Sequence, residues 1–237
     1  MLSRLGQDEG APIPPSHLPV VVKALLVHGS RWGTGGQRLK EILDADQGKH
    51  RTKWRENIAR FLGHGVLDVT RVLGCTAERA TLIGFGDIGP DEKLTYRVPL
   101  PPGLNGVRGF RALTVTLAWL TPIQPGTARY RAVALSCNPG GDKAYSLAVK
   151  RVQEQPDHHA IERGTVFHER CDGDAAAPFV DGGDLVLDVV CRPLAGGCNE
   201  PIPFGLAVSL EVGQEVGIDV YAQVRQQLAV RIPIAAP

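Results

Sequence analysis

The 237-residue chain carries 26 basic and 25 acidic side chains, which gives a formal net charge of +1. Without an excess or a block of basic residues, it lacks the charge pattern of a nucleic-acid-binding protein. Apolar residues make up 43% of the chain and charged residues 22%, so a core can form without disulfides or metals. We expect a globular protein with no nucleic-acid partner.

Neither a secretion signal nor a membrane span is visible in the sequence. Residues 1–17 are rich in Pro, Gly and polar side chains, and they lack the basic segment and apolar run of a signal peptide. The longest apolar run, residues 20–27, is interrupted by Lys23 and is too short to cross a bilayer. We therefore expect no membrane partner.

Five cysteines occur at irregular spacing: Cys75, Cys137, Cys171, Cys191 and Cys198. A disulfide framework normally shows an even, patterned set, so the odd count favours reduced thiols in a cytoplasmic protein. A disulfide between Cys191 and Cys198, across a Gly-rich turn, stays open as an alternative.

The first third of the chain has helical periodicity. Its first helix is predicted from apolar side chains at positions 18, 21, 22, 25 and 26, with Ser16 as its N-cap and Gly29 as its end. Three shorter helical segments are predicted after it: residues 39–43, a helix with Trp54, Ile58, Phe61 and Leu62 on one side, and a turn that Asp68 caps and Gly74 closes.

From residue 80 onward the sequence alternates between apolar and polar side chains. Strands are predicted at residues 80–85, 93–98, 114–120, 130–135, 185–191 and 205–212. Pro and Gly clusters separate them, and no helical pattern intervenes. This arrangement predicts an antiparallel β-sandwich or jelly roll. Residues 218–232 also fit a period of two with one gap, at Gln226, so we predict a final strand there.

Two helical segments carry a resemblance to a known family. Residues 23–30, followed by Trp32, resemble the helix after the serine-bearing helix of bacterial subtilisin-like serine peptidases. Residues 61–68 resemble the Gly-x-Gly-x-(Val/Leu)-(Asn/Asp) turn before the last helix of that catalytic domain. Five later segments resemble the C-terminal β-domain of one subtilase branch: residues 79–84, 96–101, 113–119, 163–169 and 204–211.

The resemblance implies an α+β protein in three parts. Residues 1–17 would be a flexible N-terminus, residues 18–74 a helical remnant of a subtilase α/β catalytic domain, and residues 75–237 an antiparallel β-sandwich or jelly-roll domain. The family's serine lies in a Gly-Thr-Ser motif that this sequence lacks, and no serine has the glycines of a nucleophile turn around it. We expect the chain to start after the catalytic serine, and we assign no catalytic, cofactor-binding or metal-binding residues.

The helical remnant would lack the parallel sheet that its apolar side chains normally cover. Unless the helices repack on the sandwich, an apolar surface should remain exposed, and such a surface usually marks an interface. The candidate interface residues are Val21, Val22, Leu25, Leu26, Trp54 and Ile58. The expected partner is an upstream subtilase catalytic region, in cis or in trans, and the resemblance adds an ATPase as a further partner.

Other readings remain open beside this one. The chain could be an independent β-sandwich module that binds a glycan or a protein, with Trp119 stacking on a sugar, although we expect Trp119 to fill the core. A metallohydrolase would need His158, His159 and His168 to converge, whereas we expect a solvated loop leading into an edge strand. We interpret His28 and His64 as structural side chains, because no partner nucleophile or carboxylate lies at a suitable spacing.

Overall fold

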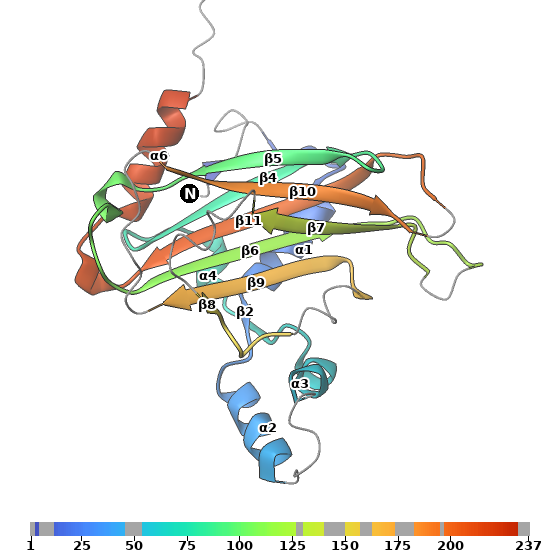
Figure 1. Cartoon of the computed structure of the whole chain (residues 1–237), viewed down its shortest axis with the longest axis horizontal. Coiled ribbons are helices and arrows are strands. Elements are labelled where there is room, and N and C mark those ends of the chain that lie inside the picture. Colours follow the sequence, from blue (N-terminus) through green and yellow to red (C-terminus); the bar gives the residue numbers. More distant parts are fainter. Residues whose placement is uncertain are drawn as a thin grey trace, which may run out of the picture.

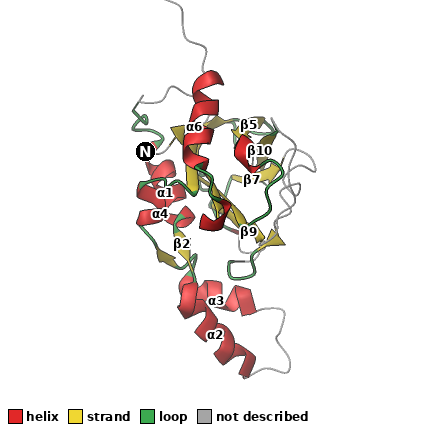
Figure 2. Cartoon of the chain, turned by 90° about the vertical axis from the view of Figure 1, so that its left-hand side faces the viewer, coloured by secondary structure: helices red, strands yellow, loops and turns green. Residues whose placement is uncertain are grey.

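The protein has an α+β fold built in three layers. The computed structural model describes residues 3–4, 12–45, 54–126, 130–139, 150–156, 163–173, 183–194 and 197–231. Helix α1 (Leu18–His28) lies against the outer face of a six-stranded sheet, and a three-stranded sheet faces the inner side (Figures 1 and 2). The expected antiparallel β architecture is therefore present, and α1 packs on it.

Consecutive strands from β4 to β7, and again from β9 to β11, alternate between the two sheets. The large sheet has the order β1 (Ser3–Arg4), β4 (Arg79–Ile88), β11 (Ile202–Val212), β6 (Arg111–Trp119), β9 (Val166–Gly173) and β8 (Lys150–Arg151). The small sheet has the order β5 (Lys93–Pro99), β10 (Asp184–Pro193) and β7 (Val133–Pro139). All these pairs are antiparallel except β1 with β4.

The core lies between the two sheets, because each strand points alternate side chains inward. On β11 the inward residues are Ile202, Phe204, Leu206, Val208, Leu210 and Val212. Trp119 at the end of β6 is only 1% exposed and belongs to the same core. The prediction that Trp119 fills the core is confirmed, and it has no free face on which a sugar could stack.

Helix α1 lies very close to β11, because that strand presents small side chains to it. The outward residues of β11 include Gly205, Ala207 and Ser209, in alternation with the large inward ones. A Cβ atom on Gly205 would come 2.6 Å from the carbonyl oxygen of Val20. Val20, Val21 and Ala24 of the helix therefore pack directly against the sheet, and all three are buried.

In the described residues, five further N-terminal elements follow α1. They are β2 (Ser30–Arg31), α2 (Gly33–Ala45), α3 (Trp54–Leu62), β3 (Val66–Leu67) and α4 (Thr70–Leu73). Of these, α2 and α3 extend beyond the edge of the large sheet (Figures 1 and 2). Each predicted helical segment is present, but α2 begins at Gly33 instead of residue 39. The indole of Trp32 donates a hydrogen bond to the Gly63 carbonyl (2.9 Å), which joins the start of α2 to the end of α3.

The prediction of a strand at residues 218–232 is wrong, because this segment forms helix α6 (Val220–Arg231). Val220, Val224 and Leu228, one turn apart, are all buried against the main core. Asp219 accepts a hydrogen bond from the Ala222 backbone N–H (2.8 Å), as an N-cap does. This capping residue was the signal for a helix, and the two-fold pattern of β-branched residues concealed it.

Two chemical expectations can also be compared with the structure. All five cysteines are free, so the alternative Cys191–Cys198 disulfide is not formed. Burial raises the pKa of the Cys191 thiol to about 11. Among the described residues, no helix has both the length and the apolar character needed to cross a bilayer.

Substituting Gly205 tests the close contact between α1 and β11. Gly205→Ala should lower the free energy of unfolding by about 1–3 kcal/mol, because the new methyl group must displace the α1 backbone. Gly86→Ala on neighbouring β4 is the matched control, since its Cβ would meet Phe204 at an ordinary 3.5 Å. Urea denaturation of the two variants measures the difference, and equal stabilities would contradict the packing described here.

Candidate functional site

A chain of buried polar side chains crosses the large sheet beneath the C-terminal end of α1. His28 Nε2 is hydrogen-bonded to Ser209 Oγ (2.6 Å), and Ser209 in turn to Thr81 Oγ1 (2.6 Å). On its other side, His28 Nδ1 is hydrogen-bonded to Thr116 Oγ1 (2.9 Å), which also contacts His168 Nδ1 (2.8 Å). We call these five residues the buried polar network.

The strand register places the network's members side by side. Thr81 of β4 is directly opposite Ser209 of β11, and Thr116 of β6 is directly opposite His168 of β9. All four point to the outer face of the large sheet, where α1 brings His28 down onto them. His28 comes last in its helix, so Gly29 ends the helix immediately after the contact is made.

Burial keeps the His28 imidazole neutral. The side chain is 2% exposed, and burial lowers its pKa to about 3. Positive charge on Arg31, Arg71, Arg79 and Arg170 lowers the pKa further in the same direction. The pKa of His168 is lowered well below its usual value for the same two reasons. Both imidazoles therefore act as neutral hydrogen-bonding groups.

The His28–Ser209 pair has the separation of a nucleophile and its general base, but its surroundings do not suit catalysis. Such a base needs an orienting carboxylate and must accept a proton. Here the other ring nitrogen meets the hydroxyl of Thr116, and the arginines oppose an imidazolium. Ser209 is also buried beneath α1, out of reach of a substrate. The buried hydrogen bond agrees with the structural interpretation of His28, although the partner Ser209 was missed because it lies 181 residues away.

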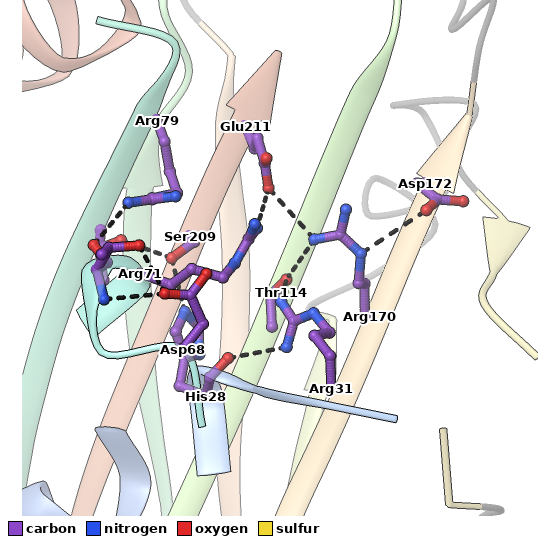
Figure 3. A network of polar contacts seen from close by, with 12 residues as sticks. His28, Arg31, Asp68, Arg71, Arg79, Thr114, Arg170, Asp172, Ser209 and Glu211 are labelled. Atoms are coloured by element: carbon purple, nitrogen blue, oxygen red, sulfur yellow. Dashed lines mark hydrogen bonds and ion pairs between the residues drawn. The ribbon is translucent and has the colours of Figure 1, made fainter. Parts of the chain in front are cut away.

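Charged side chains surround one end of the network (Figure 3). Glu211 forms ion pairs with both Arg71 and Arg170, and Arg170 also lies 3.7 Å from Asp172. Burial would raise the pKa of Glu211, but the two arginines outweigh it, so that pKa is lowered. Arg79 instead donates to the backbone carbonyls of Thr70 (3.1 Å) and Gly74 (3.3 Å).

A cavity of about 300 Å³ opens beside the network. Its lining includes Arg31, Arg170, His64, His168 and Trp32. The His64 and His168 rings meet edge to face with their centroids 5.6 Å apart. Burial lowers the pKa of His64. The cavity thus combines two guanidinium groups with two imidazoles, a grouping that the sequence did not reveal because its members come from three separate segments.

The candidate interface residues fall into three groups. Val21 and Ile58 are buried inside this chain, so they have no free surface to offer a partner. Leu25 and Trp54 are half-buried. Val22 and Leu26 are exposed by 43% and 49%, on the side of α1 away from the sheet. The interface itself stays a prediction, now limited to the outer side of α1.

The described residues do not form the alternative metal site. His168 belongs to the buried polar network, while His158 and His159 lie outside the described residues. In the part of the chain that the structure describes, no three His, Cys, Asp or Glu side chains are grouped closely enough to hold a metal ion.

Comparison of the sequence with family models gives no match, and none of the curated proteins matches it. The subtilase resemblance therefore stays a proposal.

The neutral histidines predict how stability depends on pH. The folded pKa of His28 is about 3 and its unfolded value about 6.5, so between these values only the unfolded chain takes up a proton. The contribution of His28 is complete above pH 6.5 and is lost as the pH falls, by up to about 1.4 kcal/mol per pH unit. His168 acts in the same direction.

His28→Gln keeps a side chain that can hydrogen-bond to Thr116 and Ser209 but removes the titration. The unfolding free energy of the unaltered protein should fall between about pH 6 and pH 5. In the variant we expect this fall to be smaller, by roughly the amount that proton uptake by one histidine contributes. Urea denaturation at a series of pH values measures this slope. Identical slopes in the variant and the unaltered protein would contradict a buried neutral His28.

Proposed function

We propose that this chain is a noncatalytic C-terminal segment of a subtilisin-like serine peptidase, which docks on the catalytic region and stabilises it. The observation that carries the proposal is that α1 is apolar on both of its sides. One side covers the large sheet. The other, formed by Leu18, Val22 and Leu26, is exposed.

The outer side of α1 is a continuous apolar stripe. Leu18, Val22 and Leu26 recur every four residues, which aligns them along one side of the helix, and each is more than 40% exposed. Lys23 does not interrupt the stripe. Its ammonium group donates to the Trp119 carbonyl (3.0 Å) and to Thr165 Oγ1 (2.6 Å), so it is held over the end of β6.

Helix α4 lies next to α1 on the same side of the sheet (Figure 2). Its Leu73 is 76% exposed, and Val69 just before the helix is 48% exposed. We call Leu18, Val22, Leu26, Val69 and Leu73 the outer patch. A helix that is apolar all round is normally buried between two layers, and here only one layer belongs to the described chain.

The resemblance supplies the identity of the missing layer. In subtilisin-like peptidases the helix that residues 23–30 resemble covers the parallel sheet of the catalytic domain. The outer patch would face that sheet or a helix beside it, with the catalytic region supplied in cis or in trans. The ATPase remains a further expected partner that follows from the resemblance alone.

The strand order supports a jelly-roll type for the β-domain. A jelly roll is a double sheet built from two Greek keys, in which the chain crosses repeatedly from one sheet to the other. The orders β4-β11-β6-β9 and β5-β10-β7, with alternating membership, agree with that pattern.

A second candidate function is an independent module that binds another protein. It is favoured because Val20, Val21 and Ala24 of α1 are already buried against the sheet of this chain, so α1 does not need a second domain to hold it in place. The same outer patch would then receive an unrelated protein. Glycan recognition by stacking on Trp119 is excluded because that side chain is in the core.

The docking proposal is tested by coexpressing the chain with the polypeptide encoded directly upstream. The two should copurify, and Val22→Glu should weaken their association at least about tenfold, since it places a charge in the apolar contact. Ile123→Glu is the matched control, because Ile123 is 73% exposed but lies in the loop after β6 and does not belong to the outer patch. Circular dichroism checks that both variants fold.

Two results would overturn the docking proposal. One is an upstream region that carries the Asp, His and Ser residues but does not bind this chain. The other is binding that Val22→Glu leaves unchanged.

The noncatalytic part of the proposal has its own assay. The purified chain should not hydrolyse casein, because His28 and Ser209 are buried and His28 resists protonation. Hydrolysis that a serine-directed inhibitor blocks, and that Ser209→Ala abolishes, would contradict it.

A further inference from the structure

The cavity beside the buried polar network contains the guanidinium group of Arg31, for which the described part of the chain offers no direct ion-pair partner. Arg31 donates to the carbonyls of His28 (2.9 Å) and Ser30 (2.7 Å) and weakly to Thr114 Oγ1 (3.5 Å). Among the described residues, no carboxylate lies within ion-pair distance of it. Burial, together with Arg170 and Arg71, lowers the pKa of Arg31 to about 9, although the negative charge of Glu211 acts in the opposite direction. A half-buried charge of this kind is costly unless an anion compensates it.

The other lining groups also suit an anion. Arg170 lines the same cavity, although Glu211 and Asp172 already partly neutralise it. The Nδ1 atom of His64 is buried and has no hydrogen-bond partner in the structure as described. His168 uses its Nδ1 atom for Thr116, which leaves its Nε2 atom unpaired within the described part of the chain.

The charge balance favours a single negative charge. Glu211 is shared by Arg71 and Arg170, whereas Arg31, which lines the cavity together with Arg170, has no carboxylate within ion-pair distance among the described residues. Glu154, also on the cavity wall, would repel a ligand with a second negative charge. A planar carboxylate matches the guanidinium fork, whereas a phosphate dianion would exceed the available positive charge.

Part of the remaining wall is apolar and would contact the body of the ligand. Trp32, Val152 and Pro156 contribute to this part. Polar groups elsewhere on the wall come from Ser30, Gln37 and Gln155. The volume of about 300 Å³ is at the lower end for ligand pockets, which is room for a group the size of an amino acid.

We propose that this cavity binds a carboxylate ligand of amino-acid size, held by Arg31 and Arg170, with its apolar body against Trp32. The carboxylate could belong to a free acid or to the C-terminal residue of a peptide. The inference does not rest on the docking function, because its test adds small molecules to this chain alone.

Isothermal titration calorimetry of the full chain at neutral pH tests the proposal with matched probes. N-acetyl-leucine and a tripeptide ending in leucine should bind saturably, while N-acetyl-leucine amide should not. If N-acetyl-leucine binds more tightly, the natural ligand is a free small acid. If the tripeptide binds more tightly, the natural ligand is the C-terminal carboxylate of a peptide. Equal binding of the amide, or a preference for inorganic phosphate, would overturn the proposal.

Variants connect the binding to the cavity. Arg31→Gln should weaken binding of the preferred probe by about ten- to a hundredfold, the loss expected for hydrogen bonds to a charged group. Arg79→Gln is the control, because Arg79 also donates to backbone carbonyls but does not line the cavity, and it should change affinity by less than about twofold. Unchanged binding in Arg31→Gln would refute the assignment.

If Arg31→Gln does not fold, NMR of the unaltered protein replaces it. The acid should then shift the imidazole resonances of His64 and His168, and the amide should leave them in place. Shifts elsewhere with none at these two residues would refute the assignment equally.

Discussion

The close contact between α1 and β11 determines the rest of the arrangement. It exists because β11 alternates large inward side chains with the small outward residues Gly205, Ala207 and Ser209. A strand with larger outward residues would hold the helix farther away. His28 could then no longer reach Thr116 and Ser209, and the outer stripe of α1 would sit differently relative to α4. The helix is located by steric fit at Gly205 and by hydrogen bonding at His28.

The two contacts differ in what they contribute. The apolar contact supplies burial but tolerates small shifts along the strand, whereas a buried hydrogen-bond network is satisfied in only one register. The nearby arginines reinforce this choice, because they keep His28 neutral and able to serve as donor on one ring nitrogen and acceptor on the other. The Ser209–His28 distance by itself would suggest catalysis. Its burial, the missing carboxylate and the opposing charges show why a distance alone does not define an active site.

Much of this architecture could be predicted from local pattern, and the failures have physical causes. The strands β4, β5, β6, β10 and β11 alternate clearly, and Gly29 ends α1 as predicted. The predicted N-cap was wrong, because His17 and not Ser16 precedes the helix, and no side chain caps it. Helix α6 was missed because its β-branched residues also fit a period of two, and only burial against the core decides between the readings. The buried polar network was beyond sequence reasoning, since it needs the register of four strands. The sequence predicted a single apolar side of α1, whereas the structure buries Val21 against the sheet and leaves Leu18, Val22 and Leu26 exposed on the other side. Which side packs on the sheet depends on the close approach at Gly205.

The buried polar network and the cavity share one electrostatic origin. Arg31 and Arg170 both disfavour a proton on His28 and both line the cavity. Glu211 is divided between Arg71 and Arg170, and no carboxylate of the described residues lies within ion-pair distance of Arg31. The positive charge that keeps the histidine beneath α1 neutral therefore also makes the cavity wall cationic. The packing of one helix on one strand thus fixes both an apolar surface on the outside of α1 and a cationic cavity at its end.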